Sequence, residues 1–150
     1  MIELFVFDYG RTLFDRERDM FFEDADDVLL ALSKQYRLAI VSYSKHTEVA
    51  EREKRLKDSG LYKLFEEIVF TNTPEGKNDA YAQLAESAGV AISNMAIVDD
   101  YIIRGVAWGN RNSATTYWYR NGKFADVLPN NKTGTPTHTI SSLSEILSTL

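Results

Sequence analysis

Short apolar segments alternate with longer amphipathic stretches along the whole chain. Five of the apolar segments have the length of strands, and they cover residues 2–7, 38–41, 68–70, 95–98 and 115–119. Short apolar runs with few polar interruptions are typical of strands that are covered on both faces. The stretches between them place apolar residues three and four positions apart, as expected for amphipathic helices. This alternation predicts an α/β fold, a doubly wound parallel sheet with helices on both faces.

Local signals place several helix ends and turns. Ser44 is expected to cap a charged helix over residues 45–57 that ends near Gly60, with its polar face solvated. Asn121 and Gly122 form a turn signal that predicts a hairpin. The loop over residues 129–137 is expected to be mobile. Ser142 and Glu145 have the spacing of a capping box, which predicts a final helix.

Composition narrows the class of protein without changing this picture. The 150 residues are 44% hydrophobic, which fits one domain spanning residues 1–150. No apolar run approaches the ~20 residues that cross a bilayer, and the first residues lack the features of a secretory signal. The chain has no cysteine, and we expect a cytoplasmic location and no membrane partner. The net charge of −5 argues against binding to a nucleic-acid backbone.

Polar residues follow several predicted strands at the point where each strand ends. Asp8 follows the first, Ser42 the second, and Asp99-Asp100 the fourth, while Lys77 follows the loop after the third. Ligands of such sheets bind beyond the carboxyl ends of the strands. Carboxylates suit a divalent cation such as Mg²⁺, and a lysine and a hydroxyl suit phosphate oxygens. Each residue alone is equally consistent with a turn, a cap or a solvated side chain, so the argument depends on their joint placement.

These four segments, taken together and in this order, resemble the sequence motifs of the haloacid dehalogenase (HAD) superfamily. Its motifs are an apolar strand followed by Asp-x-Asp-x-Thr, a strand ending in Ser or Thr, a lysine, and a strand ending in Gly-Asp or Asp-Asp. The corresponding segments here are residues 5–13, 40–42, 75–77 and 97–100. The resemblance covers nearly the whole chain. It implies a Rossmann-like sheet with strand order 5-4-1-2-3, and Asp8 and the Asp99-Asp100 pair on adjacent strands at the point where that order reverses.

The resemblance also implies roles for individual residues. Asp8 would be the nucleophile, attacking phosphorus to form an aspartyl-phosphate that water then hydrolyses. Thr12 would orient the loop after the nucleophile, and Ser42 and Lys77 would bind the phosphate. Mg²⁺ would be held by Asp8, the backbone carbonyl of Gly10, and Asp100, with Asp99 sharing that role. Arg11 is a candidate contact for an anionic substrate. The alternative is that Arg11 forms an ion pair at the protein surface.

Two positions depart from the family's pattern. Gly10 stands where phosphatases of the family usually have the aspartate that protonates the leaving oxygen and then activates water. Such general acid–base help is worth on the order of 10²–10⁴-fold, so its loss predicts slow reaction of poor leaving groups. Asp15 is one candidate replacement. The acidic residue expected shortly after Asp100 is also missing, and residues 101–104 read Tyr-Ile-Ile-Arg.

The dehalogenases of this family carry a sizeable helical cap between the first two motifs, whereas here only residues 14–23 precede the first long helix and no large insertion lies between residues 70 and 95. We therefore expect no sizeable cap domain. Similarity to cap-less phosphatases implies a phosphorylated small molecule or a macromolecular phosphate as substrate. Association of two copies is one way in which an open site would be covered. The function predicted is that of a magnesium-dependent phosphohydrolase.

Two alternatives stay open at this stage. One is a binding or regulatory protein that kept the scaffold and lost turnover through Gly10. The other is a phosphoacceptor receiver domain, which also uses an aspartate, a hydroxyl, a lysine and an acidic pair. Receivers place the acidic pair after the first strand, whereas this chain has a single aspartate there and the pair after the fourth, so the order disfavours this alternative.

Overall fold

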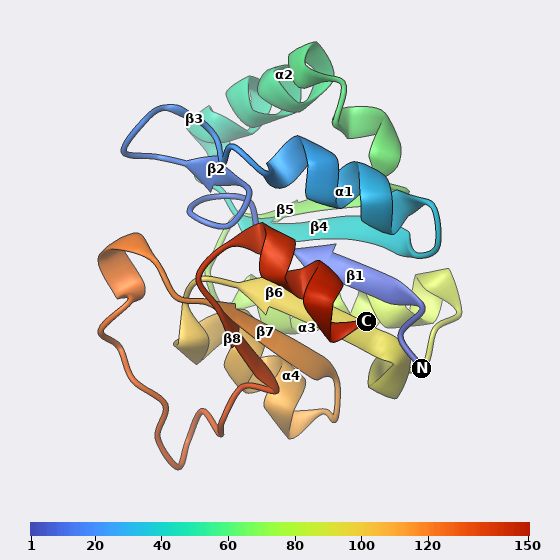
Figure 1. Cartoon of the computed structure of the whole chain (residues 1–150), viewed down its shortest axis with the longest axis vertical. Coiled ribbons are helices and arrows are strands. Elements are labelled where there is room, and N and C mark those ends of the chain that lie inside the picture. The colour runs from blue at the N-terminus through green and yellow to red at the C-terminus, as the bar shows by residue number, and fades with distance from the viewer.

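The computed structural model describes all 150 residues, and its centre is a six-stranded sheet in which all strands are parallel (Figure 1). The strands lie in the order β5-β4-β1-β6-β7-β8. Their bounds are β1 Leu4–Phe7, β4 Arg37–Tyr43, β5 Glu67–Thr71, β6 Met95–Asp99, β7 Thr115–Tyr119 and β8 His138–Ile140. The five predicted strands are confirmed in the expected order 5-4-1-2-3, which reads β7-β6-β1-β4-β5. The structure adds β8 as a sixth strand that the sequence pattern did not reveal.

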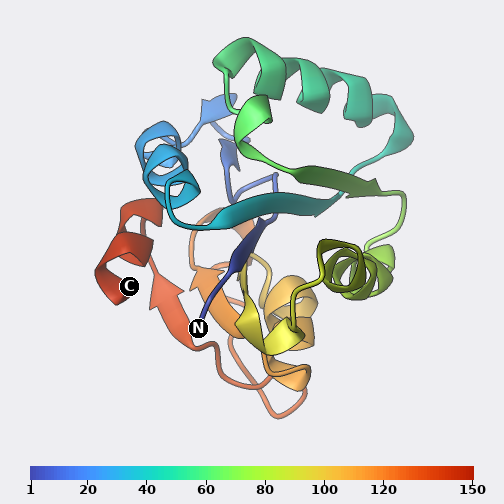
Figure 2. The ribbon, with the colours of Figure 1, turned by 90° about the vertical axis from the view of Figure 1, so that its right-hand side faces the viewer.

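Helices cover both faces of the sheet, as predicted (Figure 2). The α-helices are α1 Ala25–Ser33, α2 Val49–Ser59, α3 Gly76–Ala88 and α4 Ala107–Arg111, and a π-helical turn, η4 Ile102–Val106, precedes α4. The 3₁₀ turns are η1 His46–Glu48, η2 Tyr62–Leu64, η3 Ile92–Asn94, η5 Gly122–Phe124 and η6 Leu143–Thr149. Helix α1 and η6 lie on one face, and α3 and the η4–α4 segment lie on the other. None of the helices has the length and apolar character needed to span a bilayer.

The strand period of two divides the apolar residues between two cores. In β1, Phe5 and Phe7 pack with α1, while Leu4 and Val6 face α3, and all four side chains are inaccessible to solvent. This double burial explains why the first strand is apolar almost throughout. Because the strand is fixed on both sides, the residue that follows Phe7 has a well-defined position at the edge of the sheet.

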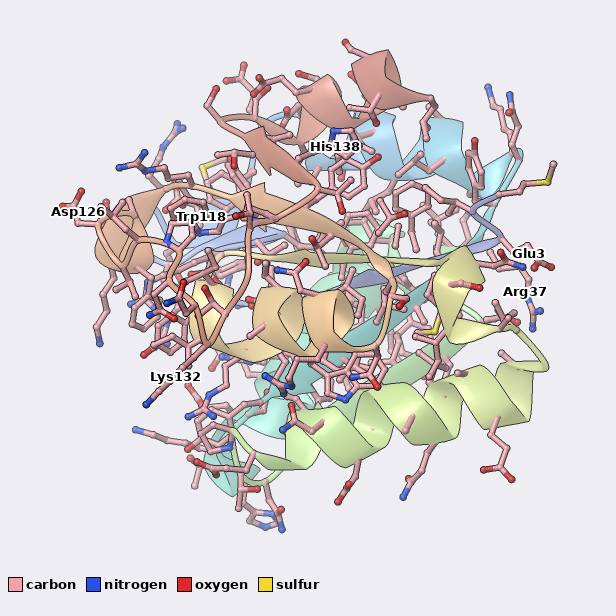
Figure 3. The ribbon with its side chains drawn as sticks, turned by 90° about the horizontal axis from the view of Figure 1, so that it is seen from below. Glu3, Arg37, Trp118, Asp126, Lys132 and His138 are labelled. Carbon is pink, nitrogen blue, oxygen red and sulfur yellow. The ribbon has the colours of Figure 1, made fainter.

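No cap domain lies between the first two strands of the sheet. The segment that follows β1 forms only a small antiparallel hairpin of β2 Phe14–Asp15 and β3 Met20–Phe21. Figure 3 shows Glu3 and Arg37 at one end of the sheet and Trp118 and Asp126 at the other. The end marked by Trp118 is the one where β1, β4 and β6 finish, and the pocket described below opens there.

Two local predictions are wrong, and a third is confirmed. Gly122 adopts φ 61° and begins η5, so Asn121 and Gly122 do not close a hairpin, and the chain goes on to β8, parallel to β7. Ser44 does not cap α2, because the turn η1 lies between them and the Ser44 Oγ instead accepts a hydrogen bond from Arg52 Nη1. The predicted final helix is the 3₁₀ helix η6, entered through the expected contact of the Ser142 amide with the Glu145 carboxylate at 2.7 Å.

Candidate active site

Five polar side chains from four elements converge at the carboxyl end of the sheet. Asp8 follows β1 directly, Ser42 lies near the end of β4, and Asp99 and Asp100 lie at the end of β6. Lys77 is the second residue of α3, which begins after the loop that follows β5. All five are buried. The structure therefore brings together the residues that the sequence placed at separate strand ends.

Asp8 is fixed by three side chains. Ser42 Oγ donates to Asp8 Oδ1 at 2.8 Å, and Lys77 Nζ donates to the same oxygen at 3.2 Å. Thr12 Oγ1 donates to Asp8 Oδ2 at 3.3 Å, which links the loop after β1 to the carboxylate. Burial raises the pKa of Asp8, and so does the neighbouring Asp99, whereas the Lys77 ammonium and the Ser42 hydroxyl lower it.

Asp99 has both oxygens occupied by donors from this chain. Lys77 Nζ and the Gly105 amide donate to Asp99 Oδ2 at 2.8 and 2.9 Å, and the Tyr101 amide donates to Oδ1 at 3.1 Å. Gly105 lies in the π-helical turn η4, and a Cβ there would come within 2.6 Å of Asp99 Oδ2. Glycine is therefore required for this close approach, and sequence reasoning missed the position.

Asp100 is buried with an oxygen that lacks a partner. Its Oδ2 accepts no hydrogen bond and is inaccessible to solvent, while its backbone carbonyl accepts a bond from Trp118 Nε1 at 3.0 Å. Burial, together with the negative charges of Asp8 and Asp99, raises the pKa of Asp100 to about 10. A buried carboxylate oxygen without a donor is costly unless a proton or a cation compensates it.

These three carboxylates fit a divalent cation. One oxygen from each of Asp8, Asp99 and Asp100 can be chosen so that the three atoms lie within 4.8 Å of one another. Hard oxygen ligands are those that Mg²⁺ prefers, and a cation would supply the partner that Asp100 Oδ2 lacks. Lys77 is the only ammonium in this cluster. Burial lowers its pKa, but Asp8 and Asp99 outweigh that effect and raise it well above the ordinary value, so Lys77 carries a charge.

The cluster forms part of the lining of a pocket of about 290 Å³. Gly10 and Arg11 line this pocket as predicted, and the guanidinium of Arg11 lies 5.9 Å from the centre of the Phe124 ring. Phe124 in turn stacks on Tyr101 with ring centres 3.9 Å apart. Five basic side chains surround the space above the carboxylates, and they are Arg11, Arg16, Lys45, Arg52 and Arg104.

Arg52 is the residue that sequence reasoning missed most clearly. The charged helix was expected to be solvated, yet Arg52 is buried, and its Nη1 donates to the Tyr43 carbonyl at 3.0 Å and to Ser44 Oγ at 2.6 Å. Its guanidinium carbon also lies 4.9 Å from the centre of the Tyr9 ring. The sequence did contain a signal for this burial. Arg52 comes three residues after Val49 and four residues before Leu56, and this spacing places all three side chains on one face of α2.

The space beside Gly10 is open. A Cβ at Gly10 would meet only Arg16 Cδ and Arg52 Nη2, both at 3.6 Å, which is ordinary contact. Asp15, the candidate replacement for the missing acid, does not line the pocket, and its Oδ1 accepts bonds from the Glu17 and Arg18 amides. The structure therefore gives no support to Asp15 in that role.

Comparison with known proteins supports the fold. No protein-family model matches the chain, and no curated protein matches it in sequence. YfnB of Bacillus subtilis, described as a HAD hydrolase bound to magnesium, matches with a TM-score of 0.75 at 16% identity, over 99% of this chain and 98% of that one. A HAD-superfamily hydrolase of subfamily IA from Geobacter sulfurreducens matches with a TM-score of 0.75 at 11% identity, over 100% of both chains.

A third match is the core domain of a protein from Streptococcus pneumoniae assigned as a phosphoglycolate phosphatase. Its TM-score is 0.67 at 16% identity, and the match covers 99% of this chain and 95% of that one. At these identities the similarity defines the fold alone. The chain has the fold of the HAD-superfamily hydrolases, which confirms at that level the resemblance inferred from the four sequence motifs.

Proposed function

We propose that this protein is a magnesium-dependent phosphohydrolase that acts on phosphate monoesters through an aspartyl-phosphate on Asp8. One observation carries the proposal: Asp8, Asp99 and Asp100 converge within 4.8 Å beside a single lysine, and Asp100 Oδ2 is buried without a partner. The fold shared with HAD hydrolases supports it, and so do two such proteins, one described as bound to magnesium and one assigned as a phosphoglycolate phosphatase.

In this proposal Asp8 and Asp100 hold the cation, with the Gly10 carbonyl as a further ligand. Asp99 serves mainly to orient Lys77, since its oxygens already accept three hydrogen bonds. Mg²⁺ would offset the repulsion between the carboxylates and the phosphate. The pKa of Asp8 is raised in the protein alone, so a bound cation would also favour the ionised form that a nucleophile needs.

In this proposal, side chains of the protein itself carry out nucleophilic attack and bind the phosphate. A carboxylate oxygen of Asp8 forms a bond to phosphorus while the bond from phosphorus to the ester oxygen breaks, and the leaving oxygen takes a proton from solvent because Gly10 supplies no acid. Water then attacks phosphorus of the aspartyl-phosphate, the bond to the Asp8 oxygen breaks, the proton of the water passes to solvent, and inorganic phosphate and the Asp8 carboxylate are released. Lys77 has three N–H donors and uses two on Asp8 and Asp99, so that one is left for a phosphate oxygen. Ser42 positions Asp8, because its hydroxyl donates to Asp8 Oδ1 at 2.8 Å, and in this proposal it also lies beside the phosphate.

Release of phosphate from 4-nitrophenyl phosphate tests the proposal, because this substrate has a good leaving group and needs no general acid. We expect turnover with Mg²⁺, none with EDTA, and a loss of at least about 10³-fold in Asp8→Asn, as for removal of a covalent nucleophile. Asp15→Asn is the matched control and should keep its activity, because Asp15 lies outside the pocket. Turnover that survives in Asp8→Asn or in EDTA would contradict the proposal.

Gly10 supports a second candidate, a binding or regulatory protein with the same scaffold. No side-chain acid stands at the position next to the leaving group, and the open space beside Gly10 is bordered by arginines. This alternative predicts that Mg²⁺ and phosphate bind while no substrate is hydrolysed, including 4-nitrophenyl phosphate. The same assay, together with a calorimetric titration of Mg²⁺, separates the two candidates.

A further inference from the structure

The pocket has a second polar wall, at the side where Gly10 leaves space. Arg52 comes from α2 and Arg16 from the segment between β2 and β3, and both side chains lie 3.6 Å from the position of a Cβ on Gly10. Glu48 is the only acid on this wall, with Oε2 at 3.9 Å from Nη2 of each arginine. An aspartate at position 10 would therefore lie beside the Arg52 guanidinium and the Arg16 side chain.

Arg52 is held in place with part of its guanidinium free. Nη1 is committed to the Tyr43 carbonyl and to Ser44 Oγ, and the residue is only 8% exposed. Nη2 makes no hydrogen bond within the chain, and its contact with Glu48 at 3.9 Å is too long for one. Because Arg52 lines the pocket, the free donors are available to a ligand, and the fixed side chain loses little conformational entropy on binding.

The charge of the pocket exceeds what one phosphate requires. Its lining contains six basic and four acidic side chains, although the chain as a whole carries a net charge of −5. With a divalent cation on the carboxylates, the pocket would stay positive after a phosphate dianion has bound. Arg16 and Arg52 share Glu48 as their one acidic neighbour in the pocket, so the wall beside Gly10 carries a net positive charge, whereas Arg104 is paired with Glu75 at 3.4 Å. Such local complementarity indicates a second negative charge on the ligand.

We propose that the substrate's leaving group carries a second anionic group, a carboxylate or a phosphate close to the ester oxygen, and that Arg52 binds it. This inference rests on the proposed function for the position of the phosphate. Arg52 would act as a specificity residue, because a planar guanidinium can bind the oxygens of either anion with paired hydrogen bonds. Arg16, which is exposed, would add charge without fixing geometry.

Binding of phosphonates tests the inference without requiring turnover. 3-Phosphonopropionate, propylphosphonate and 2-aminoethylphosphonate have the same length and end in a carboxylate, a methyl group and an ammonium group. With saturating Mg²⁺, calorimetry should show the carboxylate compound binding at least about tenfold more tightly than the propyl compound, and the ammonium compound most weakly. Ethylene-1,2-bisphosphonate shows whether a second phosphonate is preferred, and tighter binding of either this compound or 3-phosphonopropionate than of propylphosphonate supports the proposal.

Variants assign the effect to Arg52. Arg52→Gln should reduce the preference for the carboxylate over the propyl compound to less than about threefold, and Arg52→Lys should give an intermediate ratio, since lysine keeps the charge but not the fork. Lys54→Gln is the control on the same helix: it removes one positive charge from an exposed side chain outside the pocket and should keep the ratio. Thermal unfolding of each variant shows that it is folded.

The wild-type ratio decides the matter even where Arg52→Gln does not fold. Equal affinity for propylphosphonate, 3-phosphonopropionate and ethylene-1,2-bisphosphonate, or no binding of any of them, would overturn the inference, as would an unchanged ratio in both Arg52 variants. Failure of the proposed function has a different signature, namely no Mg²⁺-dependent phosphate release from 4-nitrophenyl phosphate. A protein that hydrolyses that ester but shows no preference among phosphonates keeps the function and loses the second anion site.

Discussion

The two walls of the pocket are built in opposite ways. On the phosphate side, Asp8, Asp99 and Lys77 form a dense network in which each charged group has at least two partners in the chain. On the leaving-group side, Gly10 offers no side chain, and the neighbouring Arg52 and Arg16 have donors to spare. The first wall has a net negative charge and would bind a cation, whereas the second has a net positive charge and would bind an anion.

This difference indicates how the chemistry would be divided. Residues of the phosphate wall come from the sheet edge and the first turn of α3, where burial on both sides fixes their positions. Those of the leaving-group wall come from α2 and from the segment around the small β2–β3 hairpin, outside the central sheet. A shared fold therefore supports the reaction at one wall, while selection of the substrate would fall to the other.

The largest expected effect on stability comes from removing the Lys77 ammonium. Lys77→Met leaves Asp8 and Asp99 buried without their shared partner, so the free energy of unfolding of the metal-free protein should fall by about 3–5 kcal/mol. Phosphate release should fall by about 10²–10³-fold, because a donor to the phosphate is lost. Lys63→Met, an exposed lysine, is the control. Wild-type stability and activity in Lys77→Met would break the comparison.

Asp100 should couple metal binding to pH. Its pKa of about 10 in the folded protein lies above the ordinary value of 3.8, so near neutral pH the folded state holds a proton that the unfolded state lacks. The metal-free protein should therefore lose stability as pH rises from about 4 towards 10, and Mg²⁺ binding at pH 7 should release a proton. Thermal unfolding against pH and calorimetry in two buffers measure both effects.

The matched variants for this coupling are Asp100→Asn and Asp126→Asn. Asp100→Asn should flatten the pH dependence of metal-free stability and abolish stabilisation by Mg²⁺, because the amide is neutral at every pH and is a poorer ligand. Asp126→Asn should change neither, since that side chain is exposed and lies outside the pocket. Undiminished stabilisation by Mg²⁺ in Asp100→Asn would place the cation elsewhere.

A carboxylate at position 10 tests the leaving-group wall. Gly10→Asp should raise hydrolysis of ethyl phosphate by about tenfold, below the full range for general acid catalysis, because the arginines hold the new carboxylate in its ionised form. The same variant should weaken the preference for a second anion, since the carboxylate would occupy Arg52. Gly10→Ala fits the same space and should do neither. An unchanged or lower rate would mean that another group already serves or that the pocket rejects the carboxylate.

The smallest effect is expected for Arg16. Its side chain is 46% exposed and meets Glu48 only at 3.9 Å, so solvent and salt screen its charge. Arg16→Gln should lower kcat/KM for anionic esters about two- to threefold at low ionic strength, and the difference should vanish in about 1 M salt. Arg18→Gln removes an exposed charge outside the pocket and should have no effect. A large, salt-independent loss in Arg16→Gln would make Arg16 a direct ligand.

Prediction from sequence succeeded for positions that a local pattern determines. Asp8 and Asp99 could be placed because each ends a short, fully apolar strand, and Lys77 because it opens a helix after a polar loop. The same reasoning missed β8, whose three residues are too few to show a period, and it read the signal at Gly122 as a hairpin. It gave no warning that Gly105 must approach Asp99 closely.

What the chain's own pattern determined is the alternation of strands and helices, and with it the edge of the sheet where the acidic residues had to appear. Periodicity and the residues at strand ends are local properties, so they can be read in one dimension. Only the tertiary structure decided that Arg52 turns inward beside Gly10 and that Asp100 Oδ2 is left without a donor. Those facts depend on how separate elements pack against one another, and residues 10, 52 and 100 are neighbours only after the chain has folded.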